Sequence, residues 1–142
     1  MDKLVIRGGN PLQGDVKISG AKNAVLPIMA SSLLVDGITV IRNVPDLRDT
    51  KTFIKLLEIL GAKCVLDGST LSVDASDINS LEAPYDLVKT MRASFYVMGP
   101  LLGRFGETKV SLPGGCAWGP RPVDYHLKGF EKLGASIDLN QG

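Results

Sequence analysis

The chain has 142 residues, which is one domain's worth of sequence and enough to bury a hydrophobic core. Sixteen Lys and Arg residues against fifteen Asp and Glu residues leave a formal net charge of +1, which excludes a global electrostatic attraction to nucleic acid or to an anionic membrane. Its two cysteines, Cys64 and Cys116, form no CxxC pair that would indicate zinc or a disulfide framework. No apolar run approaches the roughly 20 residues of a membrane span, and MDKLVIRGG at the start lacks the apolar core of an export signal. We therefore expect a reducing, cytoplasmic setting.

Four segments have the apolar periodicity of helices, at residues 21–34, 49–60, 85–102 and 122–133. The second is the clearest, because Phe53, Leu56, Leu57 and Leu60 form one apolar stripe and a glycine follows as a stop. In the first segment Pro27 must lie near the first turn or kink the helix.

Short β-rich runs lie between these helices. In chain order they are residues 4–7, 15–19, 39–42, 63–66, 70–74, 108–112 and 136–139. Because helices alternate with strands, the sequence predicts an α/β layered fold.

The chain also contains an internal repeat. LGAKCVLDG begins at Leu60 and LGASIDLNQ begins at Leu133, 73 positions later, and each follows a predicted helix. The segments SLLVDGITVIRNVP and PLLGRFGETKVSLPG precede them with a similar spacing. Each unit reads helix, strand, turn, helix, strand, and the second breaks off where the first continues into LDGSTLSVD. We therefore expect the second unit to be incomplete.

Three basic residues could bind an anion. Lys22 and its neighbour Asn23 follow a strand and a glycine at a predicted helix start, where free backbone N–H groups and the helix dipole favour a negative charge. On spacing alone a solvated lysine beside a turn is the more common outcome. Arg92 lies on an amphipathic helix, where a lone arginine is more often a surface residue. Arg121 stands between two prolines just before a helix, so its guanidinium could be held ready for phosphate or carboxylate, although spacing alone makes this only an even choice.

Cys116 has the stronger chemical setting of the two cysteines. It lies in SLPGGCAWGPRPVD, a loop rich in glycine with an arginine five positions on, which favours a thiol that can gain and lose a proton. A small residue tolerated in a turn is the alternative. Cys64 lies in the apolar run AKCVL, which predicts a packed, inert thiol. His126 has no carboxylate or second histidine at a telling spacing and is expected to be structural or exposed, while Asp124 could cap its helix or bind a ligand.

Four motifs in order resemble one known family. They are ISGAKNAVLP, APYDLVKTMRAS, GPLLGRFG and SLPGGCAWGPRPVDYH, and together they make the chain similar along its whole length to the UDP-N-acetylglucosamine 1-carboxyvinyltransferases, which are enolpyruvyl transferases. The resemblance implies transfer of the enolpyruvyl group of phosphoenolpyruvate to the 3-hydroxyl of UDP-N-acetylglucosamine, with release of phosphate, in peptidoglycan synthesis. It also implies an inside-out α/β barrel built from repeated βαβαββ units and no metal or organic cofactor.

The resemblance further implies a role for each matching residue. Lys22, Asn23 and Arg121 would bind phosphoenolpyruvate, and Cys116 would be the acid that protonates its methylene carbon and the residue that fosfomycin alkylates. The UDP-N-acetylglucosamine site would contain Arg92, Arg121, Pro122, Val123, Asp124 and Tyr125. Tyr125 stands where the family is expected to have an aliphatic residue, so its contact is the least certain.

The chain departs from the family in length. The family's proton-abstracting aspartate and a further arginine that contacts phosphoenolpyruvate lie in a part that has no counterpart here. Residues 1–20 would belong to the other half of the family fold, and residues 21–142 would form an incomplete N-terminal domain of about two repeats. Two alternatives stay open: a shikimate-pathway enolpyruvyl transferase, which the cysteine loop disfavours, and a non-catalytic UDP-sugar-binding fragment.

Overall fold

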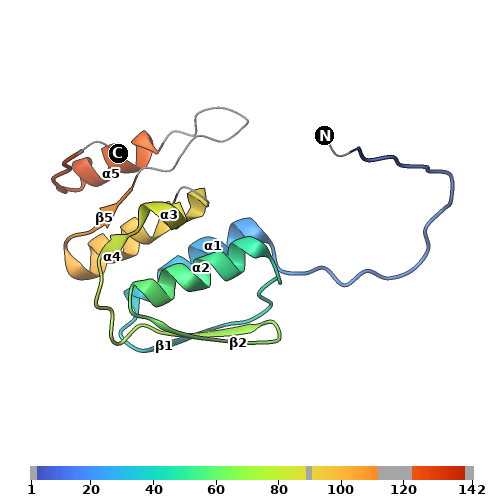
Figure 1. The fold of residues 1–142 in the computed structure, drawn as a ribbon, viewed down its shortest axis with the longest axis horizontal. Helices are drawn as coiled ribbons and strands as arrows, with labels where there is room; N and C mark the ends of the chain where they lie inside the picture. The colour runs from blue at the N-terminus through green and yellow to red at the C-terminus, as the bar shows by residue number, and fades with distance from the viewer. Residues whose placement is uncertain (1–2, 89–90, 112–122, 140–142) are drawn as a thin grey trace.

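A computed structural model describes residues 3–88, 91–111 and 123–139 (Figure 1). Residues 3–19 extend away from the α/β body that the other described residues form (Figure 1). This segment has no sheet pairing, so the strands predicted at residues 4–7 and 15–19 are wrong for this structure. An extended segment becomes a strand only when its backbone bonds to a neighbour, and here Leu4, Ile6 and Ile18 are exposed.

The first unit is an antiparallel sheet with two helices packed on one of its faces (Figure 1). Strand β3 lies between β1 and β2, and Val73 of β3 stands opposite Thr39 on one side and Cys64 on the other. The elements in chain order are α1 (Lys22–Ser31), the 3-10 helix η1 (Ser32–Leu34), β1 (Ile38–Ile41), α2 (Arg48–Ile59), β2 (Lys63–Asp67) and β3 (Thr70–Asp74). These confirm the predicted helix at 49–60 and the predicted strands at 39–42, 63–66 and 70–74 within a residue or two.

The core of this unit is the apolar stripe that the sequence predicted on the second helix. Phe53, Leu56 and Leu57 of α2 are fully buried, and they share one cluster with Leu71 and Val73 of β3. The alternation along β3 is that of a strand with one covered face, because Leu71 and Val73 are buried while the residues on either side of them are partly exposed. Burial of these side chains is the main source of stability for the unit.

The second unit begins with a short parallel pair of strands. Strand β4 (Glu82–Ala83), which the sequence did not predict, pairs with β5 (Lys109–Val110). The single helix predicted at 85–102 is wrong. The structure has α3 (Tyr85–Val88), the 3-10 helix η2 (Arg92–Val97) and α4 (Met98–Phe105) instead, and Met91 before η2 has an extended backbone with φ −145° and ψ 107° that no continuous helix allows.

Helix α5 (Asp124–Lys132) confirms the predicted fourth helix over its described part. Residues 136–139 make no sheet pairing, so the strand predicted there is wrong for this structure. The strand predicted at 108–112 is present only as the two residues of β5, and residue 112 lies outside the described part. The α/β class is confirmed, but the two small sheets do not close into a barrel within the described residues.

Arg104 joins the two units. From α4, its Nη1 donates to the backbone oxygens of Leu33, Val35 and Ala75 at 3.1, 3.1 and 2.8 Å, and its Nη2 donates to Oδ1 of Asp36 at 3.0 Å. The side chain is only 16% exposed. Because the acceptors lie in the segment that leads into β1 and directly after the end of β3, one guanidinium fixes α4 against the first unit.

Candidate functional site

Lys22 and Asn23 are the first two residues of α1, and both are exposed. Ala21 before them has an extended backbone and supplies no side-chain cap, so the helix start is left without a capping oxygen. The Nζ atom of Lys22 lies 3.0 Å from Oδ2 of Asp49, in the first turn of α2. The exposed helix start with a lysine is therefore present as predicted, and it has a carboxylate partner that the sequence did not reveal.

The turn that precedes Lys22 is fixed by a close backbone approach. A Cβ atom built on Gly20 would collide with the backbone oxygen of Asn43 and would lie 3.2 Å from Cδ of Pro45. Asn43 itself has a left-handed backbone, with φ 58°, which asparagine tolerates better than most residues. Only glycine fits at position 20, so the start of α1 is held against the connection between β1 and α2.

The start of α5 contains the second group of predicted residues. The cap position is Val123, not Asp124, so the prediction that Asp124 could cap this helix is wrong. Asp124 lies in the first turn instead, where Oδ2 accepts a hydrogen bond from Nζ of Lys128 at 3.3 Å and the buried Oδ1 has no protein partner among the described residues. Tyr125 is exposed, and the Lys128 ammonium lies 5.7 Å from the centre of its ring.

Of the remaining predicted residues, Arg92 and His126 are described by the structure and three others are not. Arg92 opens η2 and is exposed, and no hydrogen bond or ion pair between described residues joins it to Lys22 or to Asp124. Cys116, Arg121 and Pro122 lie outside the described residues, so their placement stays a prediction. His126 is exposed, as expected, and its ring stands edge-on to the buried Phe95 at 5.7 Å between centroids, which holds α5 against η2.

Cys64 is the inert thiol that the sequence predicted. It lies on β2 as a free, half-buried cysteine, and burial raises its pKa to about 12, with a smaller contribution from the negative charge of Glu58. At neutral pH the thiolate, which is the nucleophilic form, is therefore almost absent.

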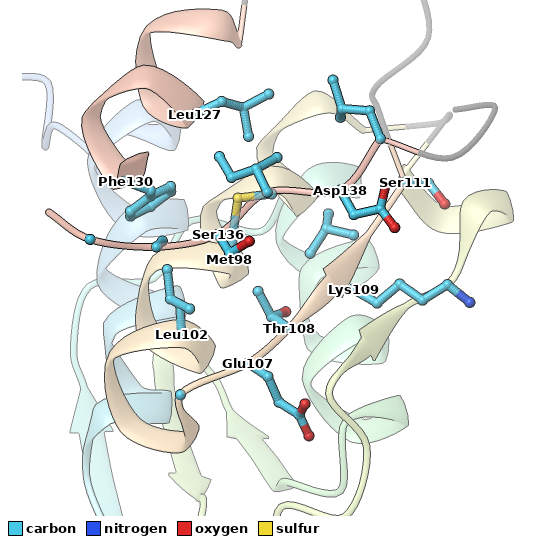
Figure 2. A pocket seen from close by; sticks show the side chains of 16 residues that line it. Met98, Leu102, Glu107, Thr108, Lys109, Ser111, Leu127, Phe130, Ser136 and Asp138 are labelled. Atoms are coloured by element: carbon cyan, nitrogen blue, oxygen red, sulfur yellow. The ribbon is translucent and has the colours of Figure 1, made fainter. Parts of the chain in front are cut away.

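A pocket of about 420 Å³ lies between α4, β5 and α5. Residues 106–111 and 134–139 line two of its sides, and apolar side chains of α4 and α5 complete it, with Met98, Leu102, Leu127 and Phe130 gathered in Figure 2. Of the predicted site residues that the structure describes, which are Lys22, Asn23, Arg92, Val123, Asp124 and Tyr125, none lines it. It is a gap between β5 and the segment after α5.

Within residues 3–88, 91–111 and 123–139, no three His, Cys, Asp or Glu side chains are grouped as a metal site would require. Among the same residues, every helix is too short or too polar to cross a bilayer.

Comparisons with known proteins agree with each other. The chain matches the family EPSP synthase (3-phosphoshikimate 1-carboxyvinyltransferase) over residues 6–142. It is 61% identical to a protein of Chloroherpeton thalassium and 59% identical to one of Chlorobaculum parvum, each over 100% of the chain and each named UDP-N-acetylglucosamine 1-carboxyvinyltransferase. The chain spans about a third of those relatives, 33% and 34% of their lengths. A crystal structure of the enolpyruvyl transferase NikO from Streptomyces tendae is similar with a TM-score of 0.62 and 34% identity, over 70% of this chain and 23% of that one.

Proposed function

The chain belongs to the EPSP synthase family, and we propose that it forms the N-terminal portion of an enzyme that transfers the enolpyruvyl group of phosphoenolpyruvate to UDP-N-acetylglucosamine. The acceptor would be the 3-hydroxyl and the second product phosphate, in the first committed step of peptidoglycan synthesis in the cytoplasm. The observation that carries the proposal is that the chain matches relatives of this name over its whole length and keeps SGAKN, TMRAS, PGGC and GPRPVD in order.

The proposed chemistry gives each motif residue a task. Cys116 would donate a proton to the methylene carbon of phosphoenolpyruvate, which develops positive charge on the central carbon, and the sugar oxygen would then bond to that carbon. Loss of a proton from the new methyl group and departure of phosphate would restore the double bond. The base for these steps has no matching residue in this chain. Lys22 and Arg121 would hold the phosphate and carboxylate groups, so that the reacting atoms meet in one orientation.

The described geometry supports the task given to Lys22. Its ammonium is exposed at the start of α1, where the uncapped N–H groups and the positive end of the helix dipole add to its charge. Asn23 is exposed beside it and could contact either ligand. The UDP-sugar site would draw on Arg92, Arg121, Pro122, Val123, Asp124 and Tyr125, of which Asp124 has a buried oxygen without a protein partner.

Two other functions are weaker. A shikimate-pathway enzyme would fit the family, but the cysteine loop and the names of the whole-chain relatives favour the UDP-sugar enzyme. A binding module without turnover is the second candidate, because the chain spans only about a third of those relatives.

We also propose that the described body is part of an inside-out barrel whose second repeat is completed by a further strand. In the first unit β3 lies between β1 and β2 and buries Leu71 and Val73. In the second unit the corresponding place, between β5 and residues 136–139, is the pocket of Figure 2. Residues 3–19 have no partner in this body, which supports their assignment to the other half of the fold.

A chimera tests the function. This chain would replace the matching third of the Chloroherpeton thalassium relative, and phosphate release would be measured with both substrates present. We expect turnover by the chimera that requires UDP-N-acetylglucosamine and is not supported by shikimate 3-phosphate. Binding of UDP-N-acetylglucosamine without turnover would favour the binding module, and turnover with shikimate 3-phosphate would favour the other enzyme.

A further inference from the structure

The two helices of the first unit begin side by side. Helices α1 and α2 pack against each other and start at the same end of the body, close to where residues 3–19 leave it (Figure 1). Lys22 is the first residue of α1, Asp49 is the second residue of α2, and their charged groups meet at 3.0 Å. The two side chains are 50% and 36% exposed, so this ion pair faces solvent instead of the core.

We propose that Asp49 is a positioning residue, which holds the Lys22 ammonium in place for an anionic substrate. The proposal rests on the proposed function, because it takes Lys22 to bind phosphoenolpyruvate. Asp49 would not touch the substrate and would act through Lys22 alone.

Exposure of the pair argues for such a role over a structural one. An ion pair between half-exposed side chains contributes little to folding stability, because water solvates both charges in the unfolded chain and screens them in the folded one. The same contact can still restrict a flexible lysine to one region. An ammonium has three N–H donors, and a bond to Asp49 leaves two for a phosphate or carboxylate oxygen.

Asp49 is itself well fixed. It lies in the first turn of α2, where the helix dipole favours a carboxylate, and α2 is anchored by the fully buried Phe53 and Leu56. The backbone before Lys22 is fixed from the other side, since Gly20 allows the close approach to Asn43. Both ends of the contact are therefore attached to rigid parts of the fold, as a preorganised ligand requires.

The chain offers a matched control. Asp46 lies just before α2, and its Oδ1 pairs with Nζ of Lys51 at 2.7 Å, with both side chains exposed. Asp46→Asn removes the same charge from the same end of α2 without touching Lys22. If the carboxylates acted only through their negative charge, removing either one would improve binding of an anion. If Asp49 positions Lys22, then Asp49→Asn impairs binding and Asp46→Asn does not.

The test uses the chimera of the preceding section and its variants Asp49→Asn, Asp49→Glu, Asp46→Asn, Lys22→Ala and Lys22→Ala with Asp49→Asn. We expect Asp49→Asn to raise KM for phosphoenolpyruvate by about 10-fold with a smaller change in kcat and an unchanged melting temperature. Asp49→Glu should recover part of the loss, and Asp46→Asn should change KM by less than about 2-fold.

The double variant decides whether Asp49 acts through Lys22. In the Lys22→Ala background, Asp49→Asn should have no further effect on KM. A KM that is unchanged or lower in Asp49→Asn, or an equal loss with and without Lys22, would overturn the proposal. An unsubstituted chimera without turnover would count against the proposed function itself, and the role of Asp49 would fail with it.

Discussion

Leu60 and Leu133 occupy equivalent places in the two units, yet Leu60 is fully buried and Leu133 is 86% exposed. Both follow the last turn of a helix, and the glycine after each has a left-handed backbone, with φ 107° at Gly61 and 97° at Gly134. The difference lies in what covers them. The N–H groups of residues 79 and 80 bond to the backbone oxygen of Leu60, and no described residue does the same at Leu133.

This contrast predicts opposite results for one substitution. In the 142-residue chain, Leu60→Ala should lower the free energy of unfolding by about 2–5 kcal/mol, because it leaves a cavity in the core. Leu133→Ala should change it by less than about 0.5 kcal/mol. Urea denaturation followed by circular dichroism measures both. In the chimera, where we propose that further chain covers α5, Leu133→Ala should become costly; an equally small effect there would argue against the missing strand.

A second prediction concerns the guanidinium that joins the units. Arg104→Lys should destabilise the chain by about 2–3 kcal/mol, because an ammonium cannot reach the three backbone oxygens and the carboxylate that the planar guanidinium bonds, and the carbonyls of the buried Leu33 and Ala75 would be left unpaired. The control is Asp36→Asn, since Asp36 is 79% exposed and its pairing should be worth less than about 1 kcal/mol. Equal losses in the two variants would mean that the ion pair, not the backbone bonds, supplies the stability.

The parts of the fold that could be predicted are those whose pattern is local. Helix α2 follows from a stripe at helical spacing, and β3 follows from alternation on a half-covered sheet. The errors occur where the secondary structure depends on pairing or packing with residues distant in the sequence. Residues 4–7 and 15–19 have strand composition but no partner, β4 has two residues and exists only through β5, and the extended Met91 interrupts a stretch with helical periodicity.

In the candidate site, too, local features could be predicted from the sequence and long-range contacts could not. Lys22 and Asn23 could be predicted because a glycine before an apolar helix is a local signal for a helix start. Asp49 could not, because its contact with Lys22 spans 27 positions and depends on how α1 packs against α2. For Asp124 the sequence allows either a helix cap or a contact with a ligand, and the structure excludes the cap, because the helix starts one residue earlier than that role requires.

The third prediction concerns the two cysteines. At pH 7, iodoacetamide should modify Cys116 and leave Cys64 unmodified in the folded chain, because burial raises the Cys64 pKa to about 12. The folded-state pKa lies above the unfolded value, so the related stability is present below about pH 9 and is lost as the pH rises toward 12. Peptide mass mapping identifies the modified cysteine. As a control, unfolding in urea should make both cysteines reactive. Modification of Cys64 in the folded chain would contradict its assignment as a packed thiol.

Peptide mass mapping also tests the fourth prediction, which concerns fosfomycin, the antibiotic that the family resemblance implies. In the chimera, the proposed role of Cys116 predicts a fosfomycin adduct on this residue only, and a faster reaction when UDP-N-acetylglucosamine is present. Cys64→Ser should react like the parent, which controls for the second thiol. An adduct on Cys64, or none in the presence of the sugar nucleotide, would remove Cys116 from the proposed acid role.

The last prediction separates charge from geometry at Arg121. Its neighbours Pro120 and Pro122 restrict the backbone, which favours a guanidinium held in one orientation for two parallel bonds to a phosphate or carboxylate. In the chimera, Arg121→Lys keeps the charge but not the planar fork, so kcat/KM for phosphoenolpyruvate should fall by about 100-fold or more, close to the loss in Arg121→Ala. Melting temperatures of the two variants should stay near that of the parent. If Arg121→Lys retains most of the activity that Arg121→Ala loses, then a positive charge is sufficient and the two-bond contact is not needed.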